Sequence, residues 1–196
     1  MRSAYNEFNF LLSALSNLQP NLWKVIRTQT VLTPGTATYT LPAYTVMVLD
    51  ASIVLNFGTQ NESRRYITPI SRTEYLSYAN QQSPGQPTVF WFDRTETPTV
   101  AFYLVPDSNG PYTFDFFSCL QVQDANLTNG ETLDVPYRWL DAVVAGVAHR
   151  LSRIYAPQLE PVRKADALEA WTIAATQDTE NVPLQLAPAL QGYFRN

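Results

Sequence analysis

A run of short β-strand candidates between residues 23 and 122 constrains the fold of this chain more than any other feature. Seven segments there are rich in β-branched and aromatic residues, and turn-forming residues such as Thr33-Pro-Gly35 and Pro84-Gly85 separate them. The seven segments are WKVIRTQTVL, ATYTL, VMVLDASIVL, RRYITPI, TVFWFD, TVAFYLV and YTFDFFSCLQV. The last three are expected to form an antiparallel meander with hairpin turns at residues 94–98 and 107–111.

One short helix is expected to interrupt the strands near residues 71–79. It begins Ser71-Arg-Thr-Glu74, where the Ser71 hydroxyl can accept a hydrogen bond from the backbone N–H of Glu74 while the Glu74 side chain reaches back. This reciprocal pair is a capping box and is typical of a helix start. We therefore expect a β-rich domain over residues 23–133 that contains this one short helix.

Helical periodicity flanks the β-rich domain on both sides. In residues 3–18, the apolar residues at helical spacing are Tyr5, Phe8, Leu11, Leu12, Leu15 and Leu18. A second helix is expected to start at Asp134, a good N-cap residue, and its apolar face comprises Leu140, Val143, Val144, Val147, Leu151 and Ile154. A third is expected at about residues 159–178, with an inward face of Val162, Ala165, Leu168 and Ala175 and with Trp171 as a further candidate.

The second helix is the candidate spine of a helical bundle. Its small residues Ala142, Ala145 and Gly146 would let another helix approach closely. Its start adjoins the end of the β-rich domain, so side chains there can fix the angle between the two parts or contact a neighbouring subunit. The candidate residues of a subunit or interdomain interface are Arg138, Trp139, Arg150 and Arg153.

These patterns predict an α+β chain in which a helical bundle carries an inserted antiparallel β-rich domain. Residues 1–22 supply the first bundle helix, residues 23–133 the insertion, and residues 134–180 the helix pair. An extended tail, residues 181–196, follows. The tail reads NVPLQLAPALQGYFRN, and its only charged side chain is Arg195. Because a free tail is normally polar, this one is expected to contact something.

The composition also points to assembly. Charged residues make up only 15% of the 196 residues, where about a quarter is usual, so a lone monomer would cover its surface poorly. The net charge of −4 makes duplex DNA an electrostatically unattractive partner. The first residues contain no long apolar run, so we expect neither a signal peptide nor a membrane span, and a protein made in the cytoplasm.

The residue types needed for catalysis or cofactor binding are scarce. His149 is the only histidine, which leaves no obvious triad or zinc site, and we expect it on a helix surface. Cys119 lies within an aromatic strand candidate and is expected to be a small buried hydrophobic residue. The seven glycines form no phosphate-binding cluster. We therefore expect no catalytic, cofactor or metal site.

Two further readings of the β-rich domain stay open. Four acids on or beside the meander are a candidate carboxylate pair for sugar hydrolysis: Asp93, Glu96, Asp107 and Asp115. Eight aromatic residues form either a core or subunit interface, or a sugar-stacking platform: Phe90, Trp91, Phe92, Phe102, Tyr103, Phe114, Phe116 and Phe117. Arg64 and Arg65 make too small a basic patch to indicate nucleic acid and are expected at a solvated strand end.

The order of five segments resembles the head-to-tail adaptor, or neck connector, proteins of short-tailed tailed phages. The segments are TVLTPGTATYTLPA, PISRTEYLSYA, SPGQPTVFWFDR, TVAFYLVPDSNGPYTFDFF and LDVPYRWLDAVVAGVAHRLSRIY. The resemblance covers nearly all of residues 22–180. Family members commonly have a further helix before the first one here, so the resemblance implies a smaller bundle in this chain.

The resemblance implies a structural virion protein of the neck, between head and tail. It implies a homo-oligomeric ring, usually of twelve subunits, that sits beneath the portal protein ring, extends the DNA channel and offers a platform for the tail nozzle protein. Genomic DNA would pass through the lumen without sequence-specific binding, and no membrane would be involved. The apolar tail would then dock on the portal through Val182, Leu184, Leu186, Leu190, Tyr193 and Phe194.

Three alternatives to the adaptor function remain at this level. The chain could instead be another tail or neck completion protein, an aromatic-rich carbohydrate-binding or receptor-binding module, or a hydrolase that uses the acids of the meander.

Overall fold

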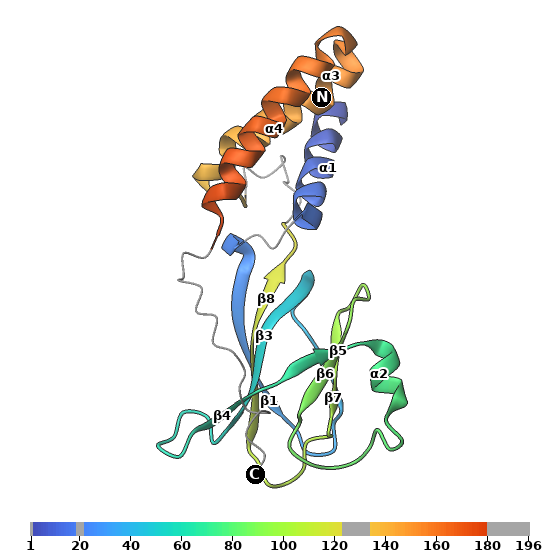
Figure 1. Cartoon of the computed structure of the whole chain (residues 1–196), viewed down its shortest axis with the longest axis vertical. Coiled ribbons are helices and arrows are strands. Elements are labelled where there is room, and N and C mark those ends of the chain that lie inside the picture. Colours follow the sequence, from blue (N-terminus) through green and yellow to red (C-terminus); the bar gives the residue numbers. More distant parts are fainter. Residues whose placement is uncertain (1, 19–21, 123–133, 180–196) are drawn as a thin grey trace, which may run out of the picture.

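The computed structural model describes residues 2–18, 22–122 and 134–179. It contains both helices and sheets, which confirms the α+β class. Figure 1 shows the three long helices α1, α3 and α4 at one end of an elongated molecule, and the strands with the short helix α2 at the other. The helices are α1 (Arg2–Leu18), α2 (Arg72–Ser77), α3 (Leu140–Tyr155) and α4 (Glu160–Gln177). The strands are β1 (Val25–Leu32), β2 (Thr38–Thr40), β3 (Thr45–Leu55), β4 (Ser63–Tyr66), β5 (Thr68–Ile70), β6 (Val89–Asp93), β7 (Thr99–Tyr103) and β8 (Tyr112–Leu120).

The strands form two four-stranded sheets. The first has the order β1-β8-β3-β4 and is antiparallel throughout. The second has the order β2-β7-β6-β5, in which β5 and β6 run parallel. One expected strand, RRYITPI, is divided between the sheets as β4 and β5, and the backbone N–H of the intervening Ile67 donates to the carbonyl of Ala51. The eight strands therefore come from the seven predicted segments.

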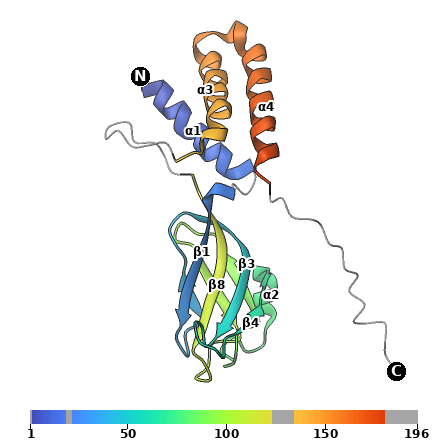
Figure 2. The ribbon, with the colours of Figure 1, turned by 90° about the vertical axis from the view of Figure 1, so that its left-hand side faces the viewer.

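The two sheets pack face to face over an aromatic core. Phe90 of β6, Phe102 of β7 and Phe114 of β8 are almost fully buried. The Phe114 ring lies 4.9 Å from Phe102 and 5.9 Å from Phe90, both in edge-on geometry, which is a favourable arrangement of aromatic quadrupoles. Burial of these rings on one face of each sheet gives the sandwich its own hydrophobic core (Figure 2).

The predicted meander is only half correct. The β6–β7 hairpin exists, with Phe90 opposite Phe102. The second hairpin is wrong, because β8 does not pair with β7 but lies between β1 and β3 in the other sheet. The chain crosses from one sheet to the other after β7. Phe114 and Phe116 of β8 therefore lie in the opposite sheet from the aromatic residues of β6 and β7. The two sets meet across the core between the sheets and are not neighbours within one sheet.

The short helix α2 begins as the sequence predicts. The Ser71 side chain accepts a hydrogen bond from the backbone N–H of Glu74 at 3.1 Å. Tyr75 is the buried residue of α2, and its ring lies 5.6 Å from that of Trp91 on β6. The helix thus covers the edge of the second sheet.

The three long helices share a second core. α3 and α4 form an antiparallel hairpin, and α1 crosses it obliquely (Figure 2). The buried side chains of this core are Leu12, Leu15, Val122, Trp139, Ala142, Val143, Ala170 and Ala174. At the crossing, a Cβ added to Gly146 would lie 2.8 Å from a terminal methyl of Leu11 of α1, so the absence of a side chain there leaves room for Leu11 between α1 and α3.

Three details of the helix predictions are wrong. Of the predicted apolar face of α3, Val143 is buried, but Leu140, Val144 and Ile154 are 43%, 59% and 50% exposed, because only the sides of α3 that pack on α1 and α4 are covered. Asp134 is not the N-cap of α3, which begins only at Leu140 after a 3-10 turn over Tyr137–Trp139; instead Asp134 pairs with Lys24. The inward face of α4 is rotated from the predicted one. Ala170 and Ala174 are buried, whereas the larger Val162 and Leu168 are 59% and 65% exposed.

The helical part and the sandwich are joined by packing and by hydrogen bonds. Val122, just after β8, is fully buried in the helical core, and its backbone N–H donates to the Ser16 hydroxyl at 3.0 Å. On the other connection, the rings of Trp23 and Trp139 lie 4.9 Å apart. The chain enters and leaves the sandwich at this joint, so both connections are tied to the helices.

Candidate functional site

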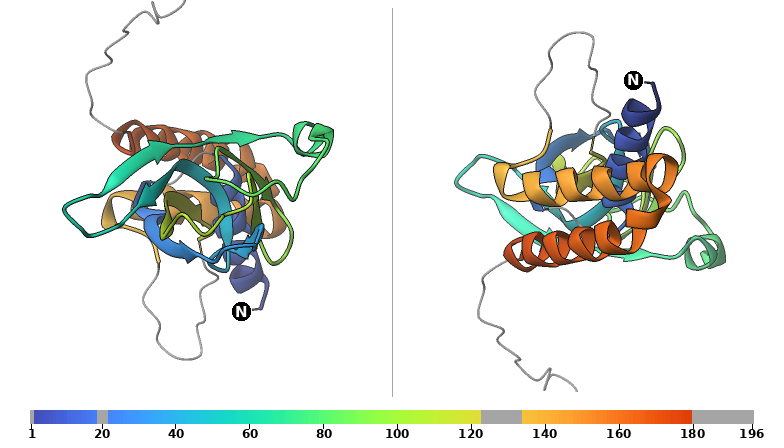
Figure 3. Two further views of the ribbon diagram at one scale, coloured as in Figure 1. Left: turned by 90° about the horizontal axis from the view of Figure 1, so that it is seen from below. Right: turned by 90° about the horizontal axis from the view of Figure 1, so that it is seen from above.

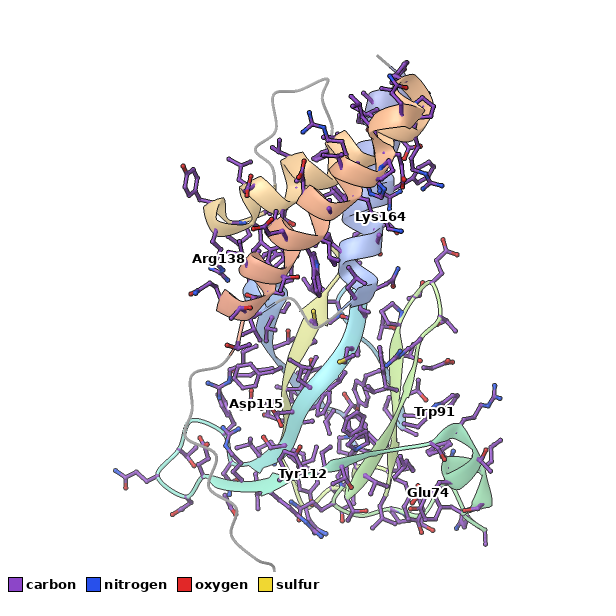
Figure 4. The ribbon with its side chains drawn as sticks, turned by 45° about the horizontal axis from the view of Figure 1, so that its top comes forward. Glu74, Trp91, Tyr112, Asp115, Arg138 and Lys164 are labelled. Atoms are coloured by element: carbon purple, nitrogen blue, oxygen red, sulfur yellow. The ribbon has the colours of Figure 1, made fainter. Side chains whose placement is uncertain are left out.

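Two of the predicted interface residues, Arg138 and Trp139, lie at the joint between the two parts. The Arg138 guanidinium donates to the Asp178 carboxylate at 2.9 Å, and this carboxylate is fully buried at the end of α4. Asp178 also accepts from the backbone N–H of Leu22 at 3.1 Å. Trp139 is completely buried beside Trp23. The start of α3, the end of α4 and the segment before β1 are therefore held at one place (Figure 4).

The other two predicted interface residues lie higher on α3. Arg150 is 3.6 Å from the Glu7 carboxylate of α1, so it links the two crossing helices. Arg153 is exposed, and none of the side chains that the structure describes forms an ion pair with it. The structure thus separates the four residues into a joint pair, a helix-crossing residue and a surface cation.

A groove of about 300 Å³ opens between α1, α3 and α4, and we call it the basic groove. Leu11 and Leu15 of α1, Gly146 of α3 and Leu168 and Trp171 of α4 form its apolar walls. The side chains that give it charge are His149, Arg150, Arg153 and Lys164. His149 contacts Glu160 at 3.0 Å and Arg150 contacts Glu7, which leaves Arg153 and Lys164 as the cations without an ion-pair partner in the described ranges.

Lys164 lies where α4 passes α1 (Figure 4). Sequence reasoning did not single it out, because its position opposite α1 depends on the packing of three helices.

The opposite side of the α3–α4 hairpin carries a second groove, which we call the acidic flank. It is lined by Asp141, Val144, Ala145, Ala148, Arg163, Asp166, Glu169, Ala170 and Ile173. Arg163 and Asp166 neutralise one another at 3.4 Å, three residues apart on α4. Asp141 and Glu169 are exposed and have no ion-pair partner among the residues that the structure describes.

Large apolar side chains extend the acidic flank along both helices. Val144 and Tyr155 lie about three turns apart on one face of α3, and Val162 and Ile173 lie about three turns apart on one face of α4. Their exposed fractions are 59%, 66%, 59% and 61%. Isolated exposed apolar residues are ordinary, but a row on two adjacent helices is typical of a protein interface.

Asp115, one of the four candidate acids, is held by two arginines. Asp115 of β8 is buried on the outer face of the first sheet, where Arg27 of β1 donates to it through two nitrogens, at 2.8 and 2.6 Å. Arg64 of β4 also pairs with Asp115 and donates to Ser52 at 2.9 Å. The hydrogen bonds from Arg27, followed by those from Arg64, lower the pKa of Asp115 to about 2, against the opposing effect of burial. A carboxylate held in this way is an ion-pair partner and has no free proton to donate.

A second candidate acid, Asp107, lies in the turn before β8. Asp107 accepts from the backbone N–H of Asn109 and from the Tyr112 hydroxyl, and the pKa of Asp107 is lowered chiefly by the first of these bonds. This is a turn-stabilising role. Arg64 and Arg65 are exposed on β4, in agreement with the expectation of a solvated position, and Arg64 also pairs with Asp115.

The aromatic residues divide between core and surface. Phe90, Phe102, Phe114 and Phe116 are buried between the sheets, so they are closed to a sugar. This confirms the core interpretation for these four rings. Trp91, Phe92 and Tyr103 are partly buried, and Phe117 is exposed beside Arg27, whose guanidinium lies 5.9 Å from the ring centre.

Within residues 2–18, 22–122 and 134–179, no three His, Cys, Asp or Glu side chains gather as a possible metal site. None of the helices in these ranges is long and apolar enough to cross a membrane. Cys119 is buried, as expected. The tail residues predicted to bind the portal, Val182 to Phe194, lie outside the described residues.

Comparison with known protein families identifies a family that this chain matches. The family model described as SU10 adaptor protein matches residues 2–187, which is nearly the whole chain and includes both the sandwich and the helices. No curated protein matches.

Proposed function

This chain belongs to the SU10 adaptor protein family, a family of phage structural adaptors, and on this premise we propose that it forms the head-to-tail adaptor ring that joins the portal to the tail nozzle and extends the DNA channel. The family match over residues 2–187 is the observation that carries the proposal. It agrees with the resemblance that the order of the sequence segments indicated. The chain is accordingly a virion component, made in the host.

The helical surfaces support a role in assembly. The α3–α4 hairpin exposes apolar side chains on the acidic flank, and the basic groove opens on its other side. A monomer gains nothing from such exposure, whereas an adaptor that is surrounded by copies of itself and by portal and nozzle subunits can bury these surfaces.

The C-terminal residues are proposed to anchor the ring on the portal. The fifteen residues from Val182 to Asn196 can span at most about 50 Å when fully extended. Burial of four large apolar side chains would contribute roughly 6–12 kcal/mol per arm before the cost of ordering the chain. Repetition around a ring would turn these arms into a multivalent attachment.

Deletion of residues 182–196 tests the anchoring. The truncated chain should keep the thermal stability of the parent, because both described cores are built from residues before 176. Its binding to isolated portal rings, measured by sedimentation, should fall by at least 100-fold. A finer test replaces Leu184, Leu186 and Leu190 by Ser, with Gln185→Ser and Gln191→Ser as the matched control. Equal binding of parent and truncated chain to portal rings would refute the anchoring role.

The channel wall is proposed to be acidic or neutral overall, so that DNA passes without adhering. Each chain contributes a net charge of −4. Several arginines already have acidic partners within the chain: Arg27 pairs with Asp115, Arg64 with Asp115 and Glu62, and Arg138 with Asp178. A ring structure by electron microscopy that shows a continuous band of unpaired Arg and Lys around the lumen would contradict this expectation.

A further inference from the structure

We propose that neighbouring copies of this chain bind each other through the two sides of the α3–α4 hairpin, with the acidic flank of one copy seated on the basic groove of the next. This inference rests on the proposed ring, and it names the two surfaces that would build it. The observations that support it are the positions of the two grooves, their uncompensated charges and their exposed apolar residues.

The two surfaces lie on opposite sides of one hairpin. Viewed from above, α3 and α4 run side by side and α1 lies against α3 (Figure 3). The residues of α3 that line the basic groove include Ala142, Gly146 and Arg153, whereas the acidic flank uses Asp141, Val144 and Ala148. Since the surfaces differ and face apart, contact between them is heterologous. Such contacts place copies head to tail and close into a ring when the rotation allows, whereas a two-fold dimer would need one surface to bind itself.

The charges left without partners are complementary. The basic groove presents Arg153 and Lys164, and the acidic flank presents Asp141 and Glu169, two unpaired charges of each sign within the described residues. Two other charged groups of the grooves are compensated inside the chain, Arg150 by Glu7 and Arg163 by Asp166, and His149 contacts Glu160. Opposed surfaces of this kind attract each other and disfavour contact between two like faces.

Both surfaces also offer apolar area around these charges. Leu168, which is 65% exposed, and Trp171 lie in the basic groove, and Val144 and Ile173 lie in the acidic flank. Contact between the two surfaces would bury these side chains together with the charges.

Charge reversal on each surface provides the test. Variant one, Arg153→Glu with Lys164→Glu, makes the groove acidic, and variant two, Asp141→Lys with Glu169→Lys, makes the flank basic. In each variant alone, the groove and the flank carry charges of the same sign and repel each other at every contact. Self-association of each variant should therefore weaken by at least about 30-fold. In an equal mixture, every contact between unlike chains again pairs opposite charges, so assembly should return with the two chains alternating.

The measurement is native mass spectrometry and sedimentation of the full chain, alone and with isolated portal rings. Arg65→Glu with Arg72→Glu, two exposed residues of β4 and α2, is the matched control and should assemble as the parent does. All four proteins should melt at similar temperatures, because the changed residues are exposed. Assembly of either variant alone at the parent's level, or no rescue in the mixture, overturns the proposed pairing. Absence of self-association by the parent in both conditions also overturns it.

The same measurements separate failure of the proposed surface pairing from failure of the proposed adaptor function. If single parent chains bind portal rings but the mixture of variants does not regain ring assembly, the portal adaptor function stands and the pairing of the two surfaces is wrong. If no chain binds portal rings yet the mixed variants assemble, the pairing stands and the proposed function is wrong.

Discussion

The carboxylate of Asp115 lies beneath two guanidinium groups on the outer face of the first sheet. Arg27 and Arg64 come from β1 and β4, so the three side chains join strands at both edges of this sheet through its centre. The Asp115 side chain is 2% exposed, whereas those of Arg27 and Arg64 are nearly half exposed. The cations therefore stay partly hydrated while the anion is covered, and the bidentate bond from Arg27 offsets much of the cost of burying the carboxylate.

This arrangement makes the stability of the sandwich depend on pH. The pKa of Asp115 is lowered from 3.8 to about 2 in the folded chain, chiefly by hydrogen bonds from Arg27. A lowered carboxyl pKa stabilises the fold above the unfolded pKa, and this contribution is lost as the pH falls from about 4 towards 2. Asp115→Asn should reduce the free energy of unfolding by roughly 2 kcal/mol at pH 7 and flatten its decline below pH 4. Thermal melts at pH 7, 4 and 2 measure this, with Asp93→Asn as the control. Parallel curves for parent and Asp115→Asn would show that the ion pairs contribute no net stability.

At the scale of the elements, α1 and α3 cross at a single close contact. Gly146 allows it, because a Cβ there would lie 2.8 Å from a terminal methyl of Leu11. Gly146→Ala should be nearly neutral, since Leu11 can shift slightly and alanine favours the helix by about 1 kcal/mol. Gly146→Leu should destabilise the helical part by roughly 1–3 kcal/mol through crowding. Denaturant melts measure both, and Val144→Leu, which adds volume at an exposed site of the same helix, is the control. A Gly146→Leu chain as stable as the parent would mean that α1 can move away from α3 without cost.

The elements themselves were largely predictable from the sequence, but several of their partners were not. Turn residues and runs of β-branched and aromatic side chains marked every strand, and Ser71 and Glu74 marked the start of α2. The pairing of β8 with β1 and β3 was missed, because adjacency in the chain favoured a hairpin with β7 and strand pairing is set by the whole core.

The candidate site was predictable only in part, for two physical reasons. Arg138 and Trp139 stand out by their position between the two parts, but their contacts, Asp178 and Trp23, are distant in sequence. The inward face of α4 was misjudged because periodicity favours large side chains as core. Here alanines fill the tight α3–α4 contact, and Val162 and Leu168 remain outside. Large apolar residues exposed in this way are better explained by contacts with other chains than by the core of this one.

At the scale of the whole molecule, the two parts have separate cores and are connected through the joint around Trp139. The sandwich core contains residues of both sheets, whereas Val122, after β8, belongs to the helical core. Trp139 is fully buried at this point and contacts Trp23, which precedes β1. The joint therefore determines how rigidly the helices are held on the sandwich, and an adaptor under load between head and tail would need that rigidity.

Trp139→Ala should uncouple the two parts while leaving the sandwich folded. Loss of a fully buried tryptophan costs about 3–5 kcal/mol, and all of that loss falls on the helical core and the joint. Calorimetry should then show two transitions in place of one, with the helices melting first. Hydrogen exchange should rise in peptides from α3 and α4 and stay unchanged in β3 and β8, whose core does not include Trp139. Phe114→Leu is the matched control, because it weakens the sandwich core instead and should raise exchange in β3 and β8 first. If exchange rises equally in both parts of Trp139→Ala, then the sandwich depends on the helices for its stability and the molecule unfolds as one unit.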